Sequence, residues 1–221
     1  IRELGGLQAR GRDSVGLVAL FDGIGGARQA LDLLGVETTM YVSAENDQRA
    51  AKVVAAAWPD VIQLGDITEI TGDSVAKLGG RFPHLALIFV VMGSPCQDTT
   101  GLDSRAVGLT GSRSCLIHEG MRIHALFCDH FQHCKVELLE ENVASMEIHG
   151  PESRRAITSL LGCTPLAICS GECTEVKRPR FYWPSWQITD WNDVEHYEDD
   201  EITYVRLEGE VPNTAKIFTG N

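Results

Sequence analysis

The sequence predicts an α/β protein with a doubly wound, mostly parallel sheet. The first observation is the run Leu85–Met92, whose eight apolar residues carry no charge and are typical of a strand buried on both faces. The second is alternation, because apolar runs of strand length are separated by stretches with helical periodicity. Such alternation implies parallel strands joined by right-handed crossovers. A length of 221 residues and a hydrophobic content of 43% are sufficient for a sizeable core.

Each element follows from the spacing of apolar residues. Short β-branched or apolar runs predict strands at 15–21, 39–44, 61–64, 85–92, 136–140 and 165–169. Apolar residues three or four positions apart predict helices at 26–34, 47–58, 71–78, 115–131 and 151–161. No comparable pattern orders the chain beyond Trp186.

A glycine turn follows the first expected strand. The segment Phe21-Asp22-Gly23-Ile24-Gly25-Gly26 separates that strand from the first helix. A strand, a glycine turn and a helix form the arrangement that holds a nucleotide-like cofactor against a helix N-terminus. The turn alone is weak evidence, since such turns are common in doubly wound folds.

A cysteine follows the strand Leu85–Met92. Gly93 and Pro95 break the strand, so Cys96 is expected on a loop at its carboxyl end, where open α/β sheets bind ligands. A thiolate there is a candidate nucleophile. The alternative is a small buried hydrophobic residue, because free cysteine is often buried.

Two further segments favour the nucleophile. Glu140-Glu141-Asn142-Val143 places a carboxylate at the end of another apolar strand. The second segment, Lys177-Arg178-Pro179-Arg180-Phe181-Tyr182-Trp183, holds two arginines one residue apart before an aromatic run. Separately, Glu141 could cap a helix and Arg178 could bind a surface carboxylate, but neither alternative explains the full set.

In their order and spacing, these segments resemble the cytosine-C5 DNA methyltransferase family. The glycine turn is similar to its cofactor motif, Pro95-Cys96-Gln97 to its nucleophile motif, Glu141-Asn142-Val143 to its acidic motif and Arg178-Pro179-Arg180 to its arginine pair. Gly111-Ser112-Arg113-Ser114 is similar to a further short motif. Val176 stands where many members carry glutamine, and this with the aromatic run after Arg180 favours the animal-type de novo branch. The resemblance covers roughly residues 15–185 and implies the Rossmann-like fold of S-adenosylmethionine-dependent methyltransferases.

The resemblance implies S-adenosylmethionine as the cofactor. The expected binding residues at the turn are Phe21, Asp22, Gly23 and Gly25, and Pro95 is expected to line the site. Glu45, at the end of the second strand, suits a ribose hydroxyl pair, and Asp66 with Ile67 is expected at the adenine. The alternative for Glu45 and Asp66 is helix capping. NAD is compatible with the turn alone, but Cys96 and Glu141 have no evident role in hydride transfer.

The resemblance also implies a reaction at a flipped-out cytosine. Cys96 would add to C6 of the base, Glu141 would hydrogen-bond N3, and Arg180 would hold the O2 edge. Arg178, the other member of the arginine pair, is expected to be catalytic as well. DNA is the expected partner. A tRNA cytosine methyltransferase and a non-catalytic regulator derived from the family stay as alternatives.

Charge is unfavourable for a nucleic-acid partner, since the net charge is −12. Nine acidic and two basic residues fall within 186–221, so the deficit is concentrated there. A local basic face remains compatible with the sequence, built from Arg105, Arg113, Arg154, Arg155, Lys177, Arg178 and Arg180. The acidic run 195–201 is typical of a solvated linker.

Composition bounds the setting. No apolar run approaches the ~20 residues of a membrane helix, no signal peptide is evident, and seven irregularly spaced cysteines favour a reducing intracellular location, nuclear in a eukaryote. The cluster Cys128-Asp-His130-Phe-Gln-His133-Cys134 lacks structural zinc spacing, so we expect no metal, core cysteines and surface histidines.

Three segments are expected: a poorly ordered leader at 1–14, a methyltransferase core at 15–185 and an acidic segment at 186–221. The family's target-recognition region and its returning cofactor-pocket segment are not recognisable after Trp183, so a truncated core is expected. Association with itself or with methyltransferase-like chains is a further expectation.

Overall fold

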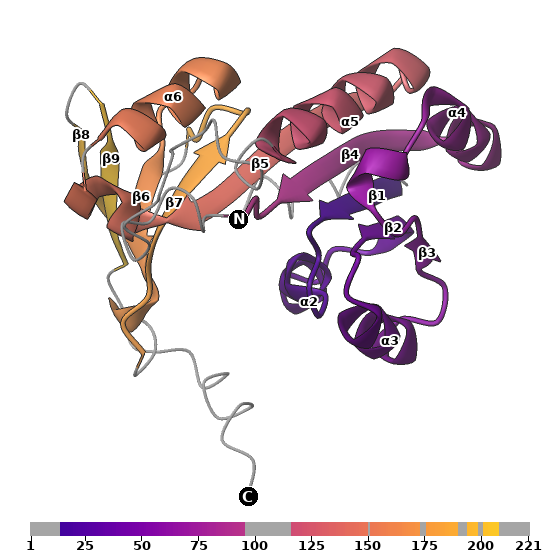
Figure 1. Cartoon of the computed structure of the whole chain (residues 1–221), viewed down its shortest axis with the longest axis horizontal. Coiled ribbons are helices and arrows are strands. Elements are labelled where there is room, and N and C mark those ends of the chain that lie inside the picture. The colour runs from indigo at the N-terminus through magenta and orange to yellow at the C-terminus, as the bar shows by residue number, and fades with distance from the viewer. Residues whose placement is uncertain are drawn as a thin grey trace, which may run out of the picture. The chain divides into compact units, whose positions relative to one another are not determined.

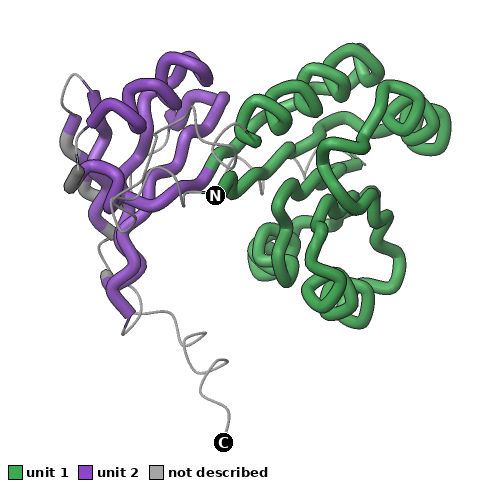
Figure 2. Tube along the Cα trace, in the orientation of Figure 1, with its two compact units in different colours: residues 1–95, 115–140 green, residues 96–114, 141–221 purple. Residues whose placement is uncertain are grey.

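The computed structural model describes residues 14–95, 116–149, 151–172, 176–189, 194–198 and 201–207. These residues fall into two compact units, coloured separately in Figure 2. Unit 1 comprises 1–95 and 115–140, and unit 2 comprises 96–114 and 141–221. The strand β5 runs from one unit into the other, since its last three residues belong to unit 2. The three-segment division expected from the sequence stays a prediction.

Unit 1 is an α/β sheet with helices on both faces, which confirms the predicted fold class. Its strands are β1 (Ser14–Leu20), β2 (Thr38–Ala44), β3 (Ile62–Gln63), β4 (Leu85–Met92) and the first part of β5 (Lys135–Val143). They lie in the order β3-β2-β1-β4-β5, and all their pairings are parallel. The helices α2 (Gly26–Leu33) and α3 (Gln48–Ala57) cover one face; α4 (Gly72–Arg81) and α5 (Leu116–His130) cover the other (Figure 1).

The core of unit 1 lies where these faces meet the sheet. Leu17, Val18, Val42, Ile88 and Val90 are fully buried, as expected for central parallel strands covered on both sides. The helix α5 contributes Ile117, Ile123 and Phe127, spaced to share one face. The strand order reverses beside β1, whose neighbours are β2 and β4, and such a switch point is where open sheets bind ligands.

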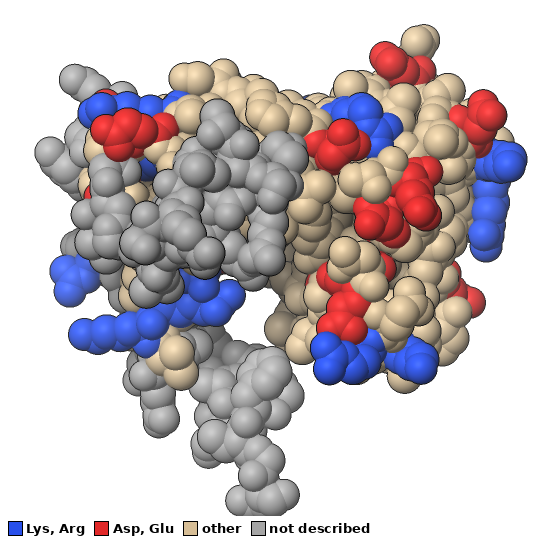
Figure 3. Space-filling view, in the orientation of Figure 1, with Lys and Arg blue, Asp and Glu red and all other residues tan. Residues whose placement is uncertain are grey.

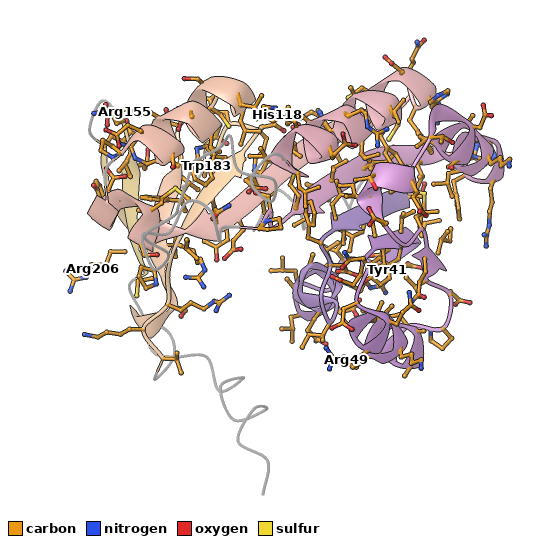
Figure 4. All side chains as sticks on the ribbon, viewed as in Figure 1. Tyr41, Arg49, His118, Arg155, Trp183 and Arg206 are labelled. Atoms are coloured by element: carbon orange, nitrogen blue, oxygen red, sulfur yellow. The ribbon has the colours of Figure 1, made fainter. Side chains whose placement is uncertain are left out.

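Unit 2 is a smaller sheet with helical turns around it. Its elements are η3 (Ala144–His149), α6 (Glu152–Leu161), β6 (Leu166–Cys169), η4 (Ser170–Glu172), β7 (Pro179–Pro184), β8 (Val194–Glu198) and β9 (Thr203–Leu207). The strand β6 pairs with β7 in antiparallel and with β9 in parallel, and β8 and β9 are antiparallel. Trp183 of β7 is fully buried and donates from Nε1 to Oγ1 of Thr158 on α6, at 2.9 Å (Figure 4).

The strands β7, β8 and β9 are absent from the sequence prediction. The strand β7 begins and ends with proline, and β8 carries acidic residues, so neither has the apolar alternation that marks a strand. Glu201, expected in a solvated linker, instead accepts hydrogen bonds from Arg154 and Arg155. Within the described residues no helix is long and apolar enough to span a bilayer.

Candidate functional site

The carboxyl ends of the unit 1 strands meet at one edge of the sheet. Leu20 lies opposite both Ala44 and Met92, and Met92 lies opposite Glu140. The backbone N–H of Leu64 donates to Ser43 O at 2.9 Å, which brings the end of β3 to the same edge. The residues that follow each strand, where the sequence places the cofactor site, therefore gather along this edge.

The glycine turn after β1 has an unusual backbone. Phe21 (φ 57°), Gly23 (φ 58°) and Gly25 (φ 88°) are all left-handed, and Phe21 is the one non-glycine residue with positive φ among the described residues. Such a conformation costs a bulky residue about 1–2 kcal/mol. Two bonds offset this cost, since Ala44 O accepts from Phe21 N at 2.9 Å and from Asp22 N at 3.4 Å. Strain of this kind clusters at ligand sites.

Gly25 is required for space as well as for its dihedral angle. A Cβ at this position would lie 2.3 Å from Cζ3 of Trp58, so the ring occupies the volume of a side chain. Trp58 is held there by its Nε1 bond to Asp32 Oδ2 at 2.9 Å and by an edge contact with Tyr41. The turn, α2 and α3 are thereby packed together.

Glu45 is bonded to the glycine turn. Its Oε2 accepts from Gly23 N and its Oε1 from Asp47 N, each at 2.8 Å. Each carboxylate oxygen can accept a second bond. The carboxylate is therefore fixed in orientation and keeps the acceptor capacity that a pair of ribose hydroxyls requires.

Asp22 carries a buried, unsatisfied oxygen. Its Oδ2 accepts from the Tyr41 hydroxyl at 2.5 Å, whereas Oδ1 is buried with no partner among the described residues. Burial raises the pKa of Asp22, the neighbouring hydroxyls of Ser43 and Tyr41 oppose this shift, and the charge of Glu45 adds to it. Burial also raises the pKa of Tyr41, which therefore stays a donor (Figure 4). An orphaned carboxylate oxygen suits a cationic ligand group.

Asp66 caps a helical turn, as the helix-capping alternative predicted. Its Oδ1 accepts from Thr68 N at 2.8 Å and from Thr68 Oγ1 at 2.7 Å, which begins the turn η1 (Ile67–Glu69). These two bonds lower the pKa of Asp66. Ile67 is buried beside it. The cap does not preclude a ligand contact, because both bonds use one oxygen.

The nucleophile motif is described only up to Pro95. Cys96 lies outside the described residues, as do Gln97, Arg105, Arg113 and the 111–114 motif. The adjoining Ser94 is buried and bonded to Glu140, with its Oγ 2.5 Å from Oε1 and its N–H 3.4 Å from the same oxygen. The approach to Cys96 is thereby tied to the end of β5.

Unit 2 brings two of the predicted catalytic residues together. Arg180 Nε lies 2.7 Å from Glu141 Oε1, and both side chains are partly buried. Arg180 also donates from Nη1 to Pro179 O at 2.9 Å, which fixes the guanidinium. Arg178 is exposed, so it does not share this environment.

The expected basic face is partly wrong. Arg154 is 1% exposed, and its guanidinium is bonded to Glu147 and Glu201 rather than presented to a polyanion. Arg155 also pairs with Glu201, at 2.8 Å. Lys177 and Arg178 are exposed as expected. On the face of unit 1 shown in Figure 3, acidic and basic side chains are interspersed.

In the cysteine and histidine cluster, His130 and His133 are exposed as expected, whereas the cysteines differ from expectation. Cys128 is exposed and Cys134 is partly exposed, so neither is a core residue; Phe127 and Phe131 are buried there instead. Burial raises the pKa of Cys134 to about 11. Among the described residues, no three histidine, cysteine or acidic side chains gather as a metal site.

Sequence reasoning missed Tyr41, Glu140 and Arg122. Tyr41 and Glu140 lie within strands and read as ordinary core or strand-end residues, so no local signal marked them. Arg122 is on α5 and pairs with Glu119 three residues earlier, a spacing visible in the sequence. Its further bonds to η1 depend on tertiary structure.

Comparison with known proteins identifies the family. The family model for C-5 cytosine-specific DNA methylase matches residues 15–125, half of the chain. A rice protein, "DNA (cytosine-5)-methyltransferase DRM2", is 28% identical over 117 residues, which cover 50% of this chain and 19% of that protein. Its Arabidopsis thaliana namesake is 30% identical over 116 residues, covering 49% and 18%. The match thus spans about a fifth of these relatives. Both are plant proteins, so the animal-type branch stays a prediction.

Solved structures share the fold. A Spodoptera frugiperda DNMT2 mutant has a TM-score of 0.58 at 18% identity, covering 90% of this chain and 57% of that one. The Entamoeba histolytica methyltransferase EhMeth has a TM-score of 0.57 at 16% identity, covering 90% and 58%. These similarities confirm the Rossmann-like methyltransferase fold. Together with the family match over the glycine turn, the strand ends and α5, they lead to one conclusion: the chain belongs to the C-5 cytosine-specific DNA methylase family.

Proposed function

We propose that this chain carries the catalytic core of a DNA cytosine-5 methyltransferase that uses S-adenosylmethionine. The observation that carries the proposal is the ion pair between Arg180 and Glu141, which lie in two separate motifs of the sequence. A guanidinium donor and a carboxyl group side by side would complement the O2 and N3 acceptors of one cytosine edge when the carboxyl group carries a proton.

The cofactor edge of unit 1 fits S-adenosylmethionine. The buried Oδ1 of Asp22 lacks a partner among the described residues and suits the cationic methionine end. Glu45 is oriented for the ribose hydroxyls, and Asp66 with Ile67 would contact the adenine. Phe21, Gly23, Gly25 and Pro95 would line the remainder of the site. When bound, the cofactor supplies an electrophilic methyl group to C5 of the cytosine.

The residues of the chain would prepare the base for this transfer. The thiolate of Cys96 adds to C6, forming a sulfur–carbon bond and placing electron density on C5. Glu141 in its protonated form donates a hydrogen bond to N3, and Arg180 holds O2, so both stabilise the developing charge. Arg178, which is exposed, is proposed to contact a phosphate of the nucleic acid. After transfer, loss of the C5 proton restores the double bond and breaks the sulfur–carbon bond.

A trapping experiment tests this chemistry. A duplex oligonucleotide containing 5-fluorocytosine should form an adduct that survives denaturing electrophoresis, because fluorine cannot leave as a cation. The adduct should require S-adenosylmethionine and disappear in Cys96→Ser. The matched control is Cys128→Ser, since Cys128 is exposed and remote from the motif in sequence.

The same experiment separates the alternatives. Trapping on a fluorocytosine RNA but not on DNA would favour the tRNA methyltransferase. Absence of any adduct with either polymer would contradict the proposal and favour a non-catalytic regulator. A DNA methyltransferase would act in the nucleus of a eukaryotic cell, which imaging of the tagged protein can check. Association with methyltransferase-like chains remains a prediction for size-exclusion measurement.

A further inference from the structure

The helix α5 is fixed against the cofactor edge of the sheet. Its buried Gly120 packs so closely that a Cβ there would lie 2.5 Å from Met92 Sδ and 3.9 Å from Leu20 Cδ1. Met92 and Leu20 are the last residues of β4 and β1. The helix therefore contacts the sheet where the glycine turn and the nucleophile motif begin.

Two residues further along α5, Arg122 bonds to the turn η1. Its Nη1 donates to Ile70 O at 2.8 Å and its Nη2 to Ile67 O at 3.2 Å. The third edge of the guanidinium is occupied as well, because Nε donates to Glu119 Oε2 at 2.7 Å. A planar guanidinium that makes three hydrogen bonds is held in one orientation. The Arg122 side chain therefore fixes the carbonyl oxygens of Ile67 and Ile70 relative to α5.

The turn η1 receives little support from the sheet. The strand β3 before it has two residues and pairs with β2 alone among the described strands. The local bonds of η1 are the Asp66 cap and the pairs Glu69 N to Asp66 O and Ile70 N to Ile67 O, at 3.1 and 3.3 Å. Ile67 and Ile70 are buried, and their burial keeps η1 packed against the protein. Burial of two apolar side chains does not fix the orientation of the turn.

We propose that Arg122 is a positioning residue for the adenine end of the cofactor site. It acts through the backbone of η1, holding Asp66 and Ile67 at the sheet edge from a helix that is itself fixed by Gly120. This inference rests on the proposed function, in which Asp66 and Ile67 contact the adenine.

Ligand binding to the whole chain tests the proposal. Calorimetry would compare S-adenosylhomocysteine with its inosine analogue, in which a carbonyl replaces the adenine amino group. In the unsubstituted chain the adenine ligand should bind more tightly. Arg122→Met, which keeps an apolar stem, should weaken the adenine ligand by about tenfold and reduce the preference between the two ligands. Arg122→Lys should fall between, because it keeps one charged donor.

The matched control is Arg81→Met. Arg81 is also a helix residue of unit 1, and its guanidinium lies over the Phe82 ring, 5.0 Å from the centroid. This variant should leave both affinities unchanged. Hydrogen exchange distinguishes a local effect on η1 from a general loss of stability. The amides of Glu69 and Ile70 should exchange faster in Arg122→Met than in Arg81→Met.

The outcomes are distinguishable. If the unsubstituted chain binds neither ligand, both this inference and the proposed function are overturned. If it binds and Arg122→Met keeps full affinity and preference, only this inference is overturned. If Arg122→Met fails to fold, Arg122→Lys decides the question by the same affinity, preference and exchange measurements.

Discussion

Two bonds from Ser94 show how a single residue joins neighbouring strand ends. Its hydroxyl and N–H both donate to Oε1 of the buried Glu140. Since Met92 and Glu140 lie opposite each other, the bond closes the gap immediately beyond the last paired residues. The carboxylate thereby gains donors that burial would otherwise deny it.

We expect Ser94→Ala to lower the free energy of unfolding by about 1.5–3 kcal/mol, because a buried carboxylate loses a hydroxyl donor. Ser94→Thr keeps that donor and should lose much less. Urea unfolding followed by circular dichroism measures both. Equal losses of stability in the two variants would show that the packing around Ser94, and not its hydrogen bond to Glu140, determines the effect.

Gly25 is the second residue with a specific requirement. Its φ of 88° and the Trp58 ring 2.3 Å from the Cβ position both oppose any side chain. Gly25→Ala should destabilise the chain by about 1–3 kcal/mol from the dihedral angle alone, with a further loss from the clash. Gly26→Ala is the control, since nothing lies within 4 Å of its Cβ position and its φ is not left-handed.

A double variant separates strain from clash at this turn. Trp58→Leu should recover part of the loss in Gly25→Ala, because it removes the ring but not the left-handed dihedral angle. Thermal unfolding of the unsubstituted chain, the two single variants and the double variant gives the coupling free energy between the two positions. Complete recovery would mean that the backbone imposes no cost.

At the scale of elements, the helix α6 is linked to the hairpin of β8 and β9 by charge. Arg154 of α6 bonds to Glu147 in η3 and to Glu201 before β9, and Arg155 also bonds to Glu201. The guanidinium of Arg154 is 2% exposed, so its two carboxylate partners compensate a costly desolvation.

This network makes unit 2 sensitive to acid. Hydrogen bonds from Arg154 and then Arg155 lower the pKa of Glu201 below its ordinary value of 4.5. A lowered pKa in the folded state means that the stabilisation is complete above the ordinary value and is lost as the pH falls through the folded value. Glu201→Gln should therefore lower the melting temperature near neutral pH and much less in acid.

Fluorescence of the buried Trp183 can follow this unfolding within unit 2 when the other three tryptophans are replaced by phenylalanine. The control is Glu198→Gln, because Glu198 is exposed on the neighbouring strand β8. A Glu201→Gln effect that is independent of pH would show that the shape of the side chain, not its charge, stabilises the network.

The elements of unit 1, together with α6 and β6 of unit 2, could be predicted well from the sequence, whereas β7, β8 and β9 could not. The strand β4 agrees with expectation at both ends because eight apolar residues and a following Gly-Ser-Pro define it locally. The strands β7 to β9 lack apolar alternation, and β9 is placed by parallel pairing of residues 203–205 with residues 166–168 of β6, which are distant in the sequence. Arg154 was expected at the surface because nothing in its neighbourhood announced that Glu201, 47 positions later, would pair with it.

For the candidate site, residue types could be predicted but not their partners. Glu45, Asp22 and the Glu141–Arg180 pair were identified from strand ends and motif order. The tyrosine that bonds Asp22 and the arginine that holds η1 come from other elements, so their roles require the three-dimensional structure.

For the whole molecule, the net charge of −12 determines the long-range electrostatic interaction with a polyanion. Long-range attraction to DNA is unfavourable, so binding depends on a few exposed cations such as Lys177 and Arg178. Each phosphate contact contributes about 1 to the slope of log affinity against log salt concentration. Lys177→Gln and Arg178→Gln should each weaken DNA binding and reduce that slope by about 1.

Fluorescence anisotropy of a labelled duplex at several salt concentrations measures the slope. Arg49→Gln in unit 1 is the control, since Arg49 is exposed but paired with Asp47 at 3.1 Å. An identical decrease in all three variants would indicate a general charge effect instead of two local phosphate contacts.

The strand β5 places two neighbouring glutamates in different units. Glu140 is fully buried and bonded to Ser94, whereas Glu141 is partly exposed and paired with Arg180. Successive residues of a strand face opposite sides of the sheet. Which of the two glutamates is buried therefore depends on the number of residues that precede them in the strand. Inserting or deleting one residue between Lys135 and Leu139 would exchange the two carboxylates. In evolutionary terms, this stretch should reject any change in length, even where it accepts a substitution of an exposed side chain such as Lys135.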